Sequence, residues 1–253
     1  MTFVDSHCHL DFEEFDEDRE DVISAAMGSG VSRFVIPGIK QTHWSRQVAL
    51  RAKYANCHLA FGIHPWFLED FKWSDMDVLR EFLLEQKPVA VGECGIDAVI
   101  DNIPKQIEVF TAQVELANEL TLPLIVHHRR SHHHILSVFK QIRPRYGGII
   151  HAFSGSFQDA DKYIKLGFKL GCGGGITYPR AEKTKQVFRR VELEHIVLET
   201  DSPTMPLHGF QGERNDPSKI VNVATELAEL KKVPLSEIAK ITTQNLAGLV
   251  LTG

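Results

Sequence analysis

Short runs of apolar, often β-branched residues recur along the chain, and each is followed by a longer segment in which apolar residues repeat with a helical period. These runs predict eight strands, at residues 3–9, 33–37, 58–65, 88–93, 123–127, 148–151, 168–171 and 195–201. Helical segments lie between and after them, among them 106–119, 181–190, 217–230 and 235–250. A regular alternation of strand and helix indicates an α/β fold with a parallel sheet.

The number of strand and helix units selects between two such folds. Eight units over 253 residues average about 32 residues each, which is the size of a closed TIM (β/α)8 barrel with short loops. An open doubly wound sheet would need a Gly-x-Gly-x-x-Gly turn after an early strand. The glycine cluster Gly171 to Gly175 comes late and is followed by Ile176, where the third glycine would belong. We therefore predict one barrel domain over residues 1–253.

Composition excludes several classes of protein. With 43% hydrophobic and 24% charged residues, the chain is typical of a globular protein, and no apolar run reaches the ~18 residues of a membrane helix. The N-terminus lacks the features of a signal peptide, so we expect a cytoplasmic protein. Cys8, Cys57, Cys94 and Cys172 are far apart, which favours reduced thiols. A net charge of −5 means that a nucleic acid would need a local basic patch or bound cations.

Side chains that can bind metals stand at the ends of six predicted strands. His7 and His9 end the first strand, where alternation places both side chains on one face. The other strand ends carry His64, Glu93, His127, His151 and Asp201. In a parallel barrel these ends lie on the face that forms active sites. Any one of them alone could be a core histidine or a helix cap, but together they predict a metal site.

The number of potential ligands exceeds what a single ion needs. Four histidines and two carboxylates suit two divalent ions bridged by a carboxylate, and we assign the bridge to Glu93. The mixed nitrogen and oxygen donors would accept zinc, manganese or magnesium. Two such ions activate a water for hydrolysis, and Asp201 is the candidate for accepting its proton. Glu93 and Asp201 are therefore the predicted catalytic residues.

The sequence around these positions resembles a known family. The segments that carry the resemblance are Asp5–Leu10, Gly62–Pro65, Val91–Asp97, Leu122–His127, His151–Gly155 and Leu198–Pro203. They look like the signatures of the TatD-type metal-dependent deoxyribonucleases, within the amidohydrolase-like barrels. The late segments Phe210–Gly212 and Asn215–Pro217 are similar to its YjjV-like branch. The resemblance implies metal ligands at His7, His9, Glu93, His127, His151 and Asp201, and DNA as the substrate.

One position departs from the family pattern. His128 stands where the family usually has serine, directly before Arg129. Strand alternation and the family motif both place His127 on the inner face. His128 nevertheless remains a competing ligand, so the register of this strand is open at this point.

Candidate substrate contacts flank the predicted ligands. His64 and Arg129 would contact phosphate, because the planar guanidinium matches phosphate oxygens, although Arg129 could equally be a salt-bridged surface residue. Lys183 and Lys185 belong to a basic segment, 178–190, that follows the seventh strand on the same face. A helix start with nearby cations can bind a DNA backbone, and the alternative is a solvated helix face.

Two further clusters have simpler interpretations. The acidic run 11–21 holds eight carboxylates, and we interpret it as the solvated start of the first helix, where acidic side chains favour the helix dipole. His132, His133 and His134 follow Ser131 at a predicted helix start and would fan out around the helix. His132 is the best placed of the three to be a ligand.

These features predict a divalent-metal-dependent phosphodiester hydrolase that removes nucleotides from DNA, with single strands or DNA ends as substrate. The alternative is a small-molecule amidohydrolase or lactonase on the same pair of ions. Many such relatives bridge their metals with a modified lysine at a strand end, and no predicted strand here ends in lysine. A metal-binding scaffold without catalysis would not need Asp201 and His64 beyond a filled coordination shell. No membrane or protein partner is implied by the sequence.

Overall fold

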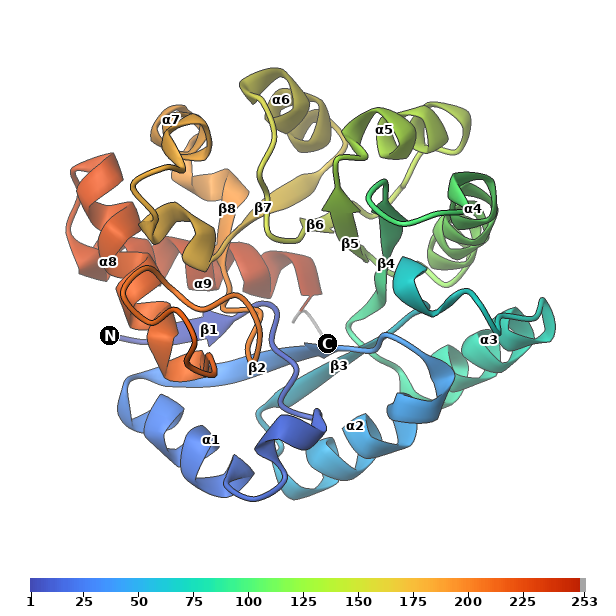
Figure 1. The fold of residues 1–253 in the computed structure, drawn as a ribbon, viewed down its shortest axis with the longest axis horizontal. Coiled ribbons are helices and arrows are strands. Elements are labelled where there is room, and N and C mark those ends of the chain that lie inside the picture. The colour runs from blue at the N-terminus through green and yellow to red at the C-terminus, as the bar shows by residue number, and fades with distance from the viewer. Residues whose placement is uncertain (251–253) are drawn as a thin grey trace.

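The computed structural model describes residues 1–250, so the last three residues of the predicted 1–253 domain lie outside the described part. Eight parallel strands form one sheet in which each strand pairs with the next along the chain (Figure 1). They are β1 (Phe3–Asp5), β2 (Val31–Pro37), β3 (Cys57–Phe61), β4 (Ala90–Asp97), β5 (Leu124–Arg129), β6 (Gly148–Ile150), β7 (Phe168–Cys172) and β8 (Ile196–Leu198). This sequential order is the one expected for repeated right-handed βα units.

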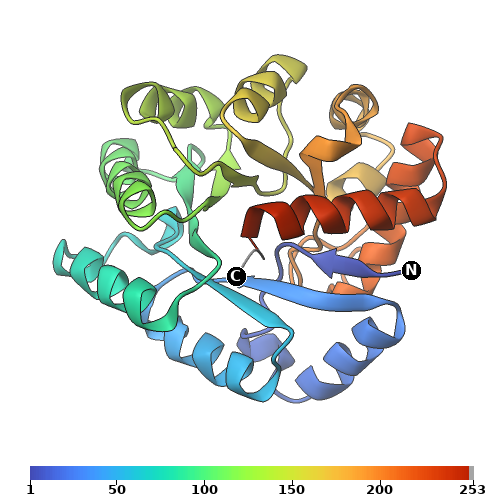
Figure 2. The same cartoon turned by 180° about the vertical axis from the view of Figure 1, so that it is seen from behind.

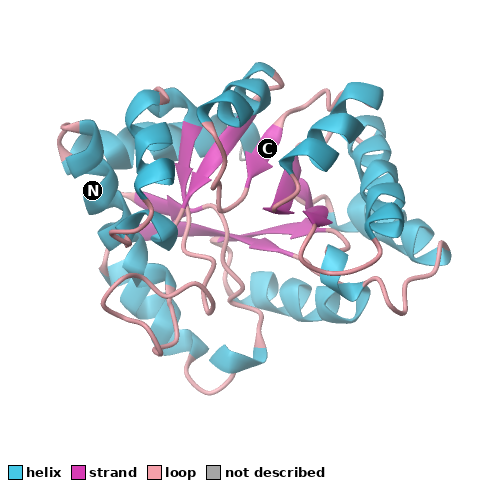
Figure 3. Cartoon of the chain, turned by 45° about the horizontal axis from the view of Figure 1, so that its top comes forward, coloured by secondary structure: helices cyan, strands magenta, loops and turns pink. Residues whose placement is uncertain are grey.

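Hydrogen bonds between the segments that follow β1 and β8 bring the two sheet edges together. Ser6 N donates to Leu198 O, and Asp201 N donates to His7 O, each at 2.9 Å. Helices surround the strands (Figure 3). They are α1 (Arg19–Gly28), α2 (Gln41–Lys53), α3 (Ser74–Gln86), α4 (Ile103–Glu119), α5 (His132–Gln141), α6 (Phe157–Lys165), α7 (Glu182–Arg190), α8 (Ile220–Lys231) and α9 (Leu235–Val250). The predicted TIM (β/α)8 barrel is confirmed.

A layer of apolar side chains fills the barrel between its two ends. The strands contribute Val4, Val35, Ala60, Ala90, Ile125, Ile149 and Val197, and α9 adds Leu246. Helix α9 lies across the barrel at its amino end (Figure 2), where it contacts β1 and β8. That end is therefore sealed, and polar side chains can gather only at the carboxyl end of the strands.

Several strands are shorter than predicted at the ends that carry the candidate ligands. Strand β1 ends at Asp5, β3 at Phe61 and β8 at Leu198, so His7, His64 and Asp201 lie on the segments that follow. The backbone of these segments does not continue the hydrogen bonding of the sheet. After β1, for example, His9 N donates to Ser202 O, in the segment after β8, at 2.7 Å. His7 and His9 therefore converge because of the loop that follows β1, and not because of regular strand alternation. By contrast, β4 and β5 run further than predicted.

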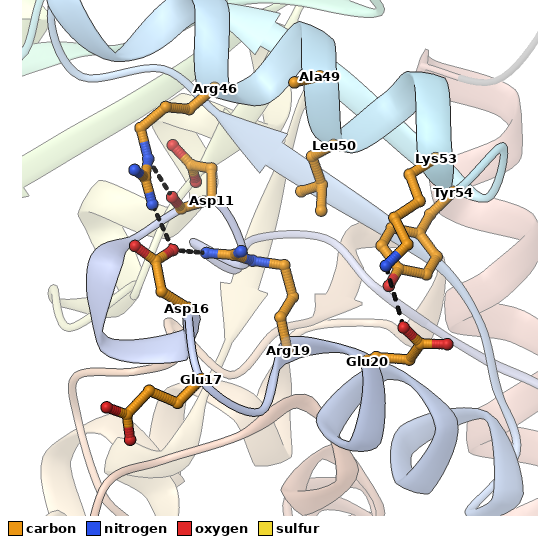
Figure 4. A pocket seen from close by; sticks show the side chains of 10 residues that line it. All are labelled: Asp11, Asp16, Glu17, Arg19, Glu20, Arg46, Ala49, Leu50, Lys53 and Tyr54. Atoms are coloured by element: carbon orange, nitrogen blue, oxygen red, sulfur yellow. Dashed lines mark hydrogen bonds and ion pairs between the residues drawn. The ribbon is translucent and has the colours of Figure 1, made fainter.

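The acidic run 11–21 requires a correction, because α1 begins only at Arg19. Asp11 is buried, and burial raises its pKa to about 6. Asp16 accepts hydrogen bonds from Arg19 and Arg46 in a depression between α1 and α2 (Figure 4). These ion pairs join the segment after His9 to α1 and α2. Most carboxylates of the run are exposed, as the sequence interpretation expected, so the correction concerns the start of α1 and the burial of Asp11.

The expectations about cysteines and membranes were tested in residues 1–250. Cys8, Cys57, Cys94 and Cys172 are all free and buried, as predicted for reduced thiols. No helix in this range is both long enough and apolar enough to span a bilayer.

Candidate metal centre

Imidazole nitrogens and carboxylate oxygens converge at the carboxyl end of the barrel. Among the described residues, three groups have ligand atoms within 4.8 Å of one another. They are His7, His9 and Asp201; His7, Glu93 and His151; and His64, Glu93 and His127. The six residues predicted as ligands are thus brought together, and His64 joins them.

Glu93 stands between two of these groups and faces each with a different oxygen. Its Oε2 lies 3.2 Å from His7 Nε2 and 3.7 Å from His9 Nε2. Its Oε1 lies 3.1 Å from His127 Nδ1. Burial alone would raise the pKa of this carboxyl, but the imidazoles of His7 and His64 outweigh burial and hold it well below its ordinary value. An ionised carboxylate with one oxygen toward each group would be able to serve as a ligand in either group.

The first group gathers around Asp201. Its Oδ1 lies 3.5 Å from His7 Nε2, 3.6 Å from His9 Nε2 and 3.7 Å from His151 Nε2. Burial would raise the pKa of Asp201, but the three histidines, His151 foremost, lower it below its ordinary range. Asp201 has a left-handed backbone (φ +56°), a conformation that aspartate tolerates better than most residues. The turn this makes after β8 brings the carboxylate over the barrel.

Asp5 ties together the two segments that carry His7 and Asp201. Its Oδ1 accepts hydrogen bonds from the backbone N of His7 and of Thr200, both at 3.1 Å. Its Oδ2 accepts from Thr200 Oγ1 at 2.6 Å. Thr200 therefore links the two segments through hydrogen bonds, and both Asp5 and Thr200 are fully buried. Asp5 fixes the relative position of two ligand-bearing loops without facing the ion site itself.

The structure places His127, and not His128, beside Glu93. His128 lies on the other side of β5, where its ring packs against that of His132 at 4.3 Å between centroids. Gly95 lies opposite His127 in the β4 and β5 pairing, and a Cβ there would meet His127 O at 2.0 Å. Only glycine allows the two strands to approach so closely at this point. His132 in turn contacts Tyr163 Oη at 3.1 Å through Nδ1, so its surroundings are those of a packed side chain.

Asp97 holds the ring of His127 from the opposite side, and sequence reasoning gave it no role. Its Oδ2 lies 3.4 Å from His127 Nε2, and the residue is completely buried. A carboxylate at Nε2 keeps a proton on that nitrogen and leaves the lone pair of Nδ1 for a cation. The four-residue spacing of Glu93 and Asp97 could have indicated this role, because it places both side chains on one face of a strand. The predicted strand ended at Glu93, so Asp97 was left outside it.

His64 faces Glu93 with its protonated nitrogen, whereas His127 faces Glu93 with its unprotonated one. Its Nδ1 accepts a hydrogen bond from Trp66 N at 3.1 Å, so the proton of the neutral ring is on Nε2. Burial lowers the pKa of His64 to about 4, and the ring is therefore neutral near pH 7. The Nε2–H group points toward Glu93 Oε1 at 3.5 Å. His64 is thus suited to donate a hydrogen bond, which fits its predicted contact with substrate better than a role as ligand.

His151 also meets a carboxylate with its second nitrogen. Glu199 Oε1 lies 3.0 Å from His151 Nδ1 and accepts a hydrogen bond from Ala152 N at 2.6 Å. Burial would lower the pKa of His151, but Glu199 and Asp201 together raise it to about 10. Glu199 was also missed by sequence reasoning, although it lies within the quoted motif Leu198–Pro203. Its contact fixes which nitrogen of His151 faces Asp201.

The residues present fit the binding of divalent metal ions. The Nε2 atoms of His7 and His9 lie 3.2 Å apart and face the same carboxylates, while their buried Nδ1 atoms have no hydrogen-bond partner. Nitrogen and oxygen donors at this spacing match the preferences of zinc or manganese, and the carboxylates those of magnesium. Without a cation, the protonated ring of His151 offsets part of the negative charge of the carboxylates.

We therefore expect metal uptake to release protons. The pKa of His151 is raised to about 10, so this ring is protonated near pH 7 in the metal-free protein, and an imidazolium cannot bind a cation. Hydrogen bonds with Asp97 and Glu93 raise the pKa of His127 in the same direction, against the effect of burial. Apparent metal affinity should rise with pH between 7 and about 10, by about tenfold per pH unit for each proton displaced. Titration calorimetry in buffers of different ionisation enthalpy measures this release. An affinity independent of pH, with no proton released at pH 7, would contradict the assignment.

A cavity of about 500 Å³ opens above these ligands. Arg129 lies at its edge with half of its side chain exposed, 4.0 Å from Asp97 Oδ2. Lys183 is exposed and lines a neighbouring hollow that shares Ser154 with the cavity.

The prediction for Lys185 requires correction: its ammonium pairs with Glu226 of α8 at 2.7 Å and is largely buried. The ion pair joins helices α7 and α8 and leaves Lys185 no freedom to hold a substrate.

Comparison with known proteins places this centre in a family. The family model described as TatD related DNase matches residues 4–250. The chain belongs to the TatD family. It is 38% identical over 248 residues to YjjV of Escherichia coli K12, described as an uncharacterized metal-dependent hydrolase, with 96% of this chain and 95% of that protein covered. YabD of Bacillus subtilis 168, which has the same description, is 37% identical over 244 residues, with 95% and 96% covered.

A solved structure of a TatD-family member has the same fold. The crystal structure of YjjV, a TatD homolog from Escherichia coli K12, matches with a TM-score of 0.95 and covers 98% of both chains. Together with the clustered histidine and carboxylate side chains, this identifies a metal-dependent hydrolase of the TatD family.

Proposed function

We propose that this TatD-family protein hydrolyses phosphodiester bonds of DNA, removing nucleotides from an end, with two divalent ions per chain. The observation that carries the proposal is the position of Glu93, whose two oxygens face two separate groups of donors. Paired cations suit phosphodiester hydrolysis because one can act on the attacking oxygen and the other on the leaving oxygen. The family description, TatD related DNase, points to the same substrate.

Each residue of the centre has a role that follows from its contacts. When bound, the ions lower the pKa of a coordinated water and offset the charge that develops on the phosphate. Asp201 is ionised and accepts the proton of the attacking water. His64 donates its Nε2–H to a phosphate oxygen, and Arg129 approaches the phosphate from the edge of the cavity. Asp97 and Glu199 hold His127 and His151 in the orientation that binding requires.

The size and charge of the site favour single strands and ends. A cavity of about 500 Å³ suits one nucleotide and is too small for a duplex. A second hollow of about 550 Å³ adjoins it, shares Asp201 and Met205, and has Arg180 in its wall. Arg180 and Lys183 would hold the phosphates of the neighbouring nucleotides. A chain of net charge −5 needs such local positive charge in order to attract DNA. Four free thiols fit a cytoplasmic location.

A substrate panel tests the proposal. Protein loaded with zinc, manganese or magnesium is given end-labelled single-stranded DNA, duplex DNA, circular single-stranded DNA, and a set of lactones and amides. We expect linear single strands to shorten from one end, and circles to resist. If no DNA is cleaved with any metal while lactones or amides are hydrolysed and chelator stops the reaction, the protein is a small-molecule hydrolase instead.

A further inference from the structure

A tryptophan stands exposed at the edge of the metal cavity. Trp66 lines the cavity, two residues after His64, and 54% of it is accessible to solvent. Tryptophan is highly buried on average, because its large apolar surface is costly to leave in water. An exposed indole beside a catalytic centre is therefore a candidate for contact with a ligand.

The indole is held in place by the centre itself. Its Nε1 donates to Asp97 Oδ2 at 2.7 Å, which is the same oxygen that faces His127 Nε2. The ring meets His64 edge to face, with 5.4 Å between centroids and an interplanar angle of 89°. Because the ring is fixed before any ligand arrives, binding to its face costs little conformational entropy.

Further apolar side chains line the cavity beside Trp66, whereas its floor is charged. Phe12, which stacks on His9 at 4.4 Å, Phe67 and the exposed Met205 line the same cavity as Trp66. Glu93, Asp201 and the histidines form the floor, and Arg129 adds a positive charge to the lining. A ligand that matches both parts has an anionic group at one end and a flat ring at the other. A nucleotide has this composition.

We propose that Trp66 stacks on the base of the nucleotide whose phosphodiester bond lies at the metal centre. This inference rests on the proposed function and deepens it, because it selects DNA ends whose last base is unpaired. Every base has a flat face, so stacking on one aromatic ring binds bases with little sequence preference. A paired base remains stacked within the duplex and must unpair before it can reach the indole.

The chain offers a matched control for the test. Trp73 is exposed to a similar extent, 56%, but packs against Phe71 and does not line the metal cavity. Trp66→Ala should raise the KM for a single-stranded oligonucleotide by about 5- to 100-fold, as expected for the loss of one base stack. Trp73→Ala should leave it unchanged. Trp66→Phe keeps a ring but loses the hydrogen bond to Asp97, and should retain most of the affinity.

An oligonucleotide with an abasic residue at the scissile position isolates the stacking contact. The KM of the wild-type protein should be raised on this substrate, and Trp66→Ala should add nothing further, because the partner of the ring is already missing. Binding can be followed without turnover: a phosphorothioate oligonucleotide, which resists cleavage, should quench the indole fluorescence of Trp73→Ala but not that of Trp66→Ala.

The outcomes separate this inference from the function on which it rests. If wild-type protein cleaves oligonucleotides and Trp66→Ala has an unchanged KM, the stacking proposal is wrong and the proposed function stands. A fall in kcat and in metal content alone would assign Trp66 to positioning Asp97, which also overturns stacking. If wild-type protein cleaves no oligonucleotide with any metal, the proposed function fails and the inference fails with it.

Discussion

Replacing Glu93 with glutamine should abolish turnover and weaken both ion sites. The substitution keeps the shape of the side chain but removes the negative charge from a residue that is only 3% exposed and lies between His7 and His127. A bridging carboxylate offsets the charge of two cations, so the loss should reach several kcal/mol of transition-state stabilisation, or roughly 10³-fold in kcat or more. Elemental analysis after dialysis, combined with steady-state kinetics, measures both effects.

The control for this experiment is Glu85→Gln, which makes the same change on the exposed side of α3. It should retain full activity and metal content. A Glu93→Gln protein that binds two ions and turns over normally would show that Glu93 is not the bridge. Loss of only one ion would place Glu93 in a single site.

Replacing Asp201 with asparagine should lower kcat by about 10²- to 10⁴-fold, the usual contribution of a general base. Its pKa is held below the ordinary range, so the carboxylate is free to accept a proton at neutral pH, whereas an amide is not. Asp201 also lines both cavities and is the least buried carboxylate of the centre. Because the amide oxygen can still be a ligand, part of the bound metal should remain. Rates and metal content measured on the same preparation separate the two roles.

Thr204→Val provides the comparison for Asp201. Thr204 Oγ1 donates to Asp201 Oδ2 at 2.9 Å, so the variant removes one hydrogen bond and leaves the carboxylate in place. We expect less than about a tenfold change, in line with the loss of a single hydrogen bond to a charged group. If Asp201→Asn retained kcat within a few fold while Thr204→Val did not, Asp201 could not be the base.

The convergence of the ligands was predictable because it depends on topology. In a parallel barrel the carboxyl ends of the strands meet on one face, whatever the details of each loop. The positions of Glu93, His127, His151 and Asp201 along the chain were therefore enough to bring them together. Alternation along β5 favoured His127 but left His128 as a competitor, and the structure has His127 beside Glu93.

The residues that hold the ligands were not predictable in the same way. Asp97 lies beyond the apolar run that predicts β4. Only the structure shows that β4 continues to Asp97, which places its side chain on the same face as that of Glu93. Lys185 and Glu226, which pair across two helices, are 41 residues apart in sequence, and no local pattern indicates such a contact. The acidic run was misinterpreted for a related reason, since the partners of Asp16 and Asp18 include Arg46 and Arg214 from distant segments.

A metal titration followed by DNA hydrolysis tests the proposed function most directly. Chelator-treated protein is titrated with manganese while the release of nucleotides from an end-labelled single strand is recorded. We expect no activity without metal, a rise as the ions bind, and saturation at two ions per chain. Full activity in excess chelator, or no nucleotide release at two ions per chain with manganese, zinc or magnesium, would contradict the proposed function.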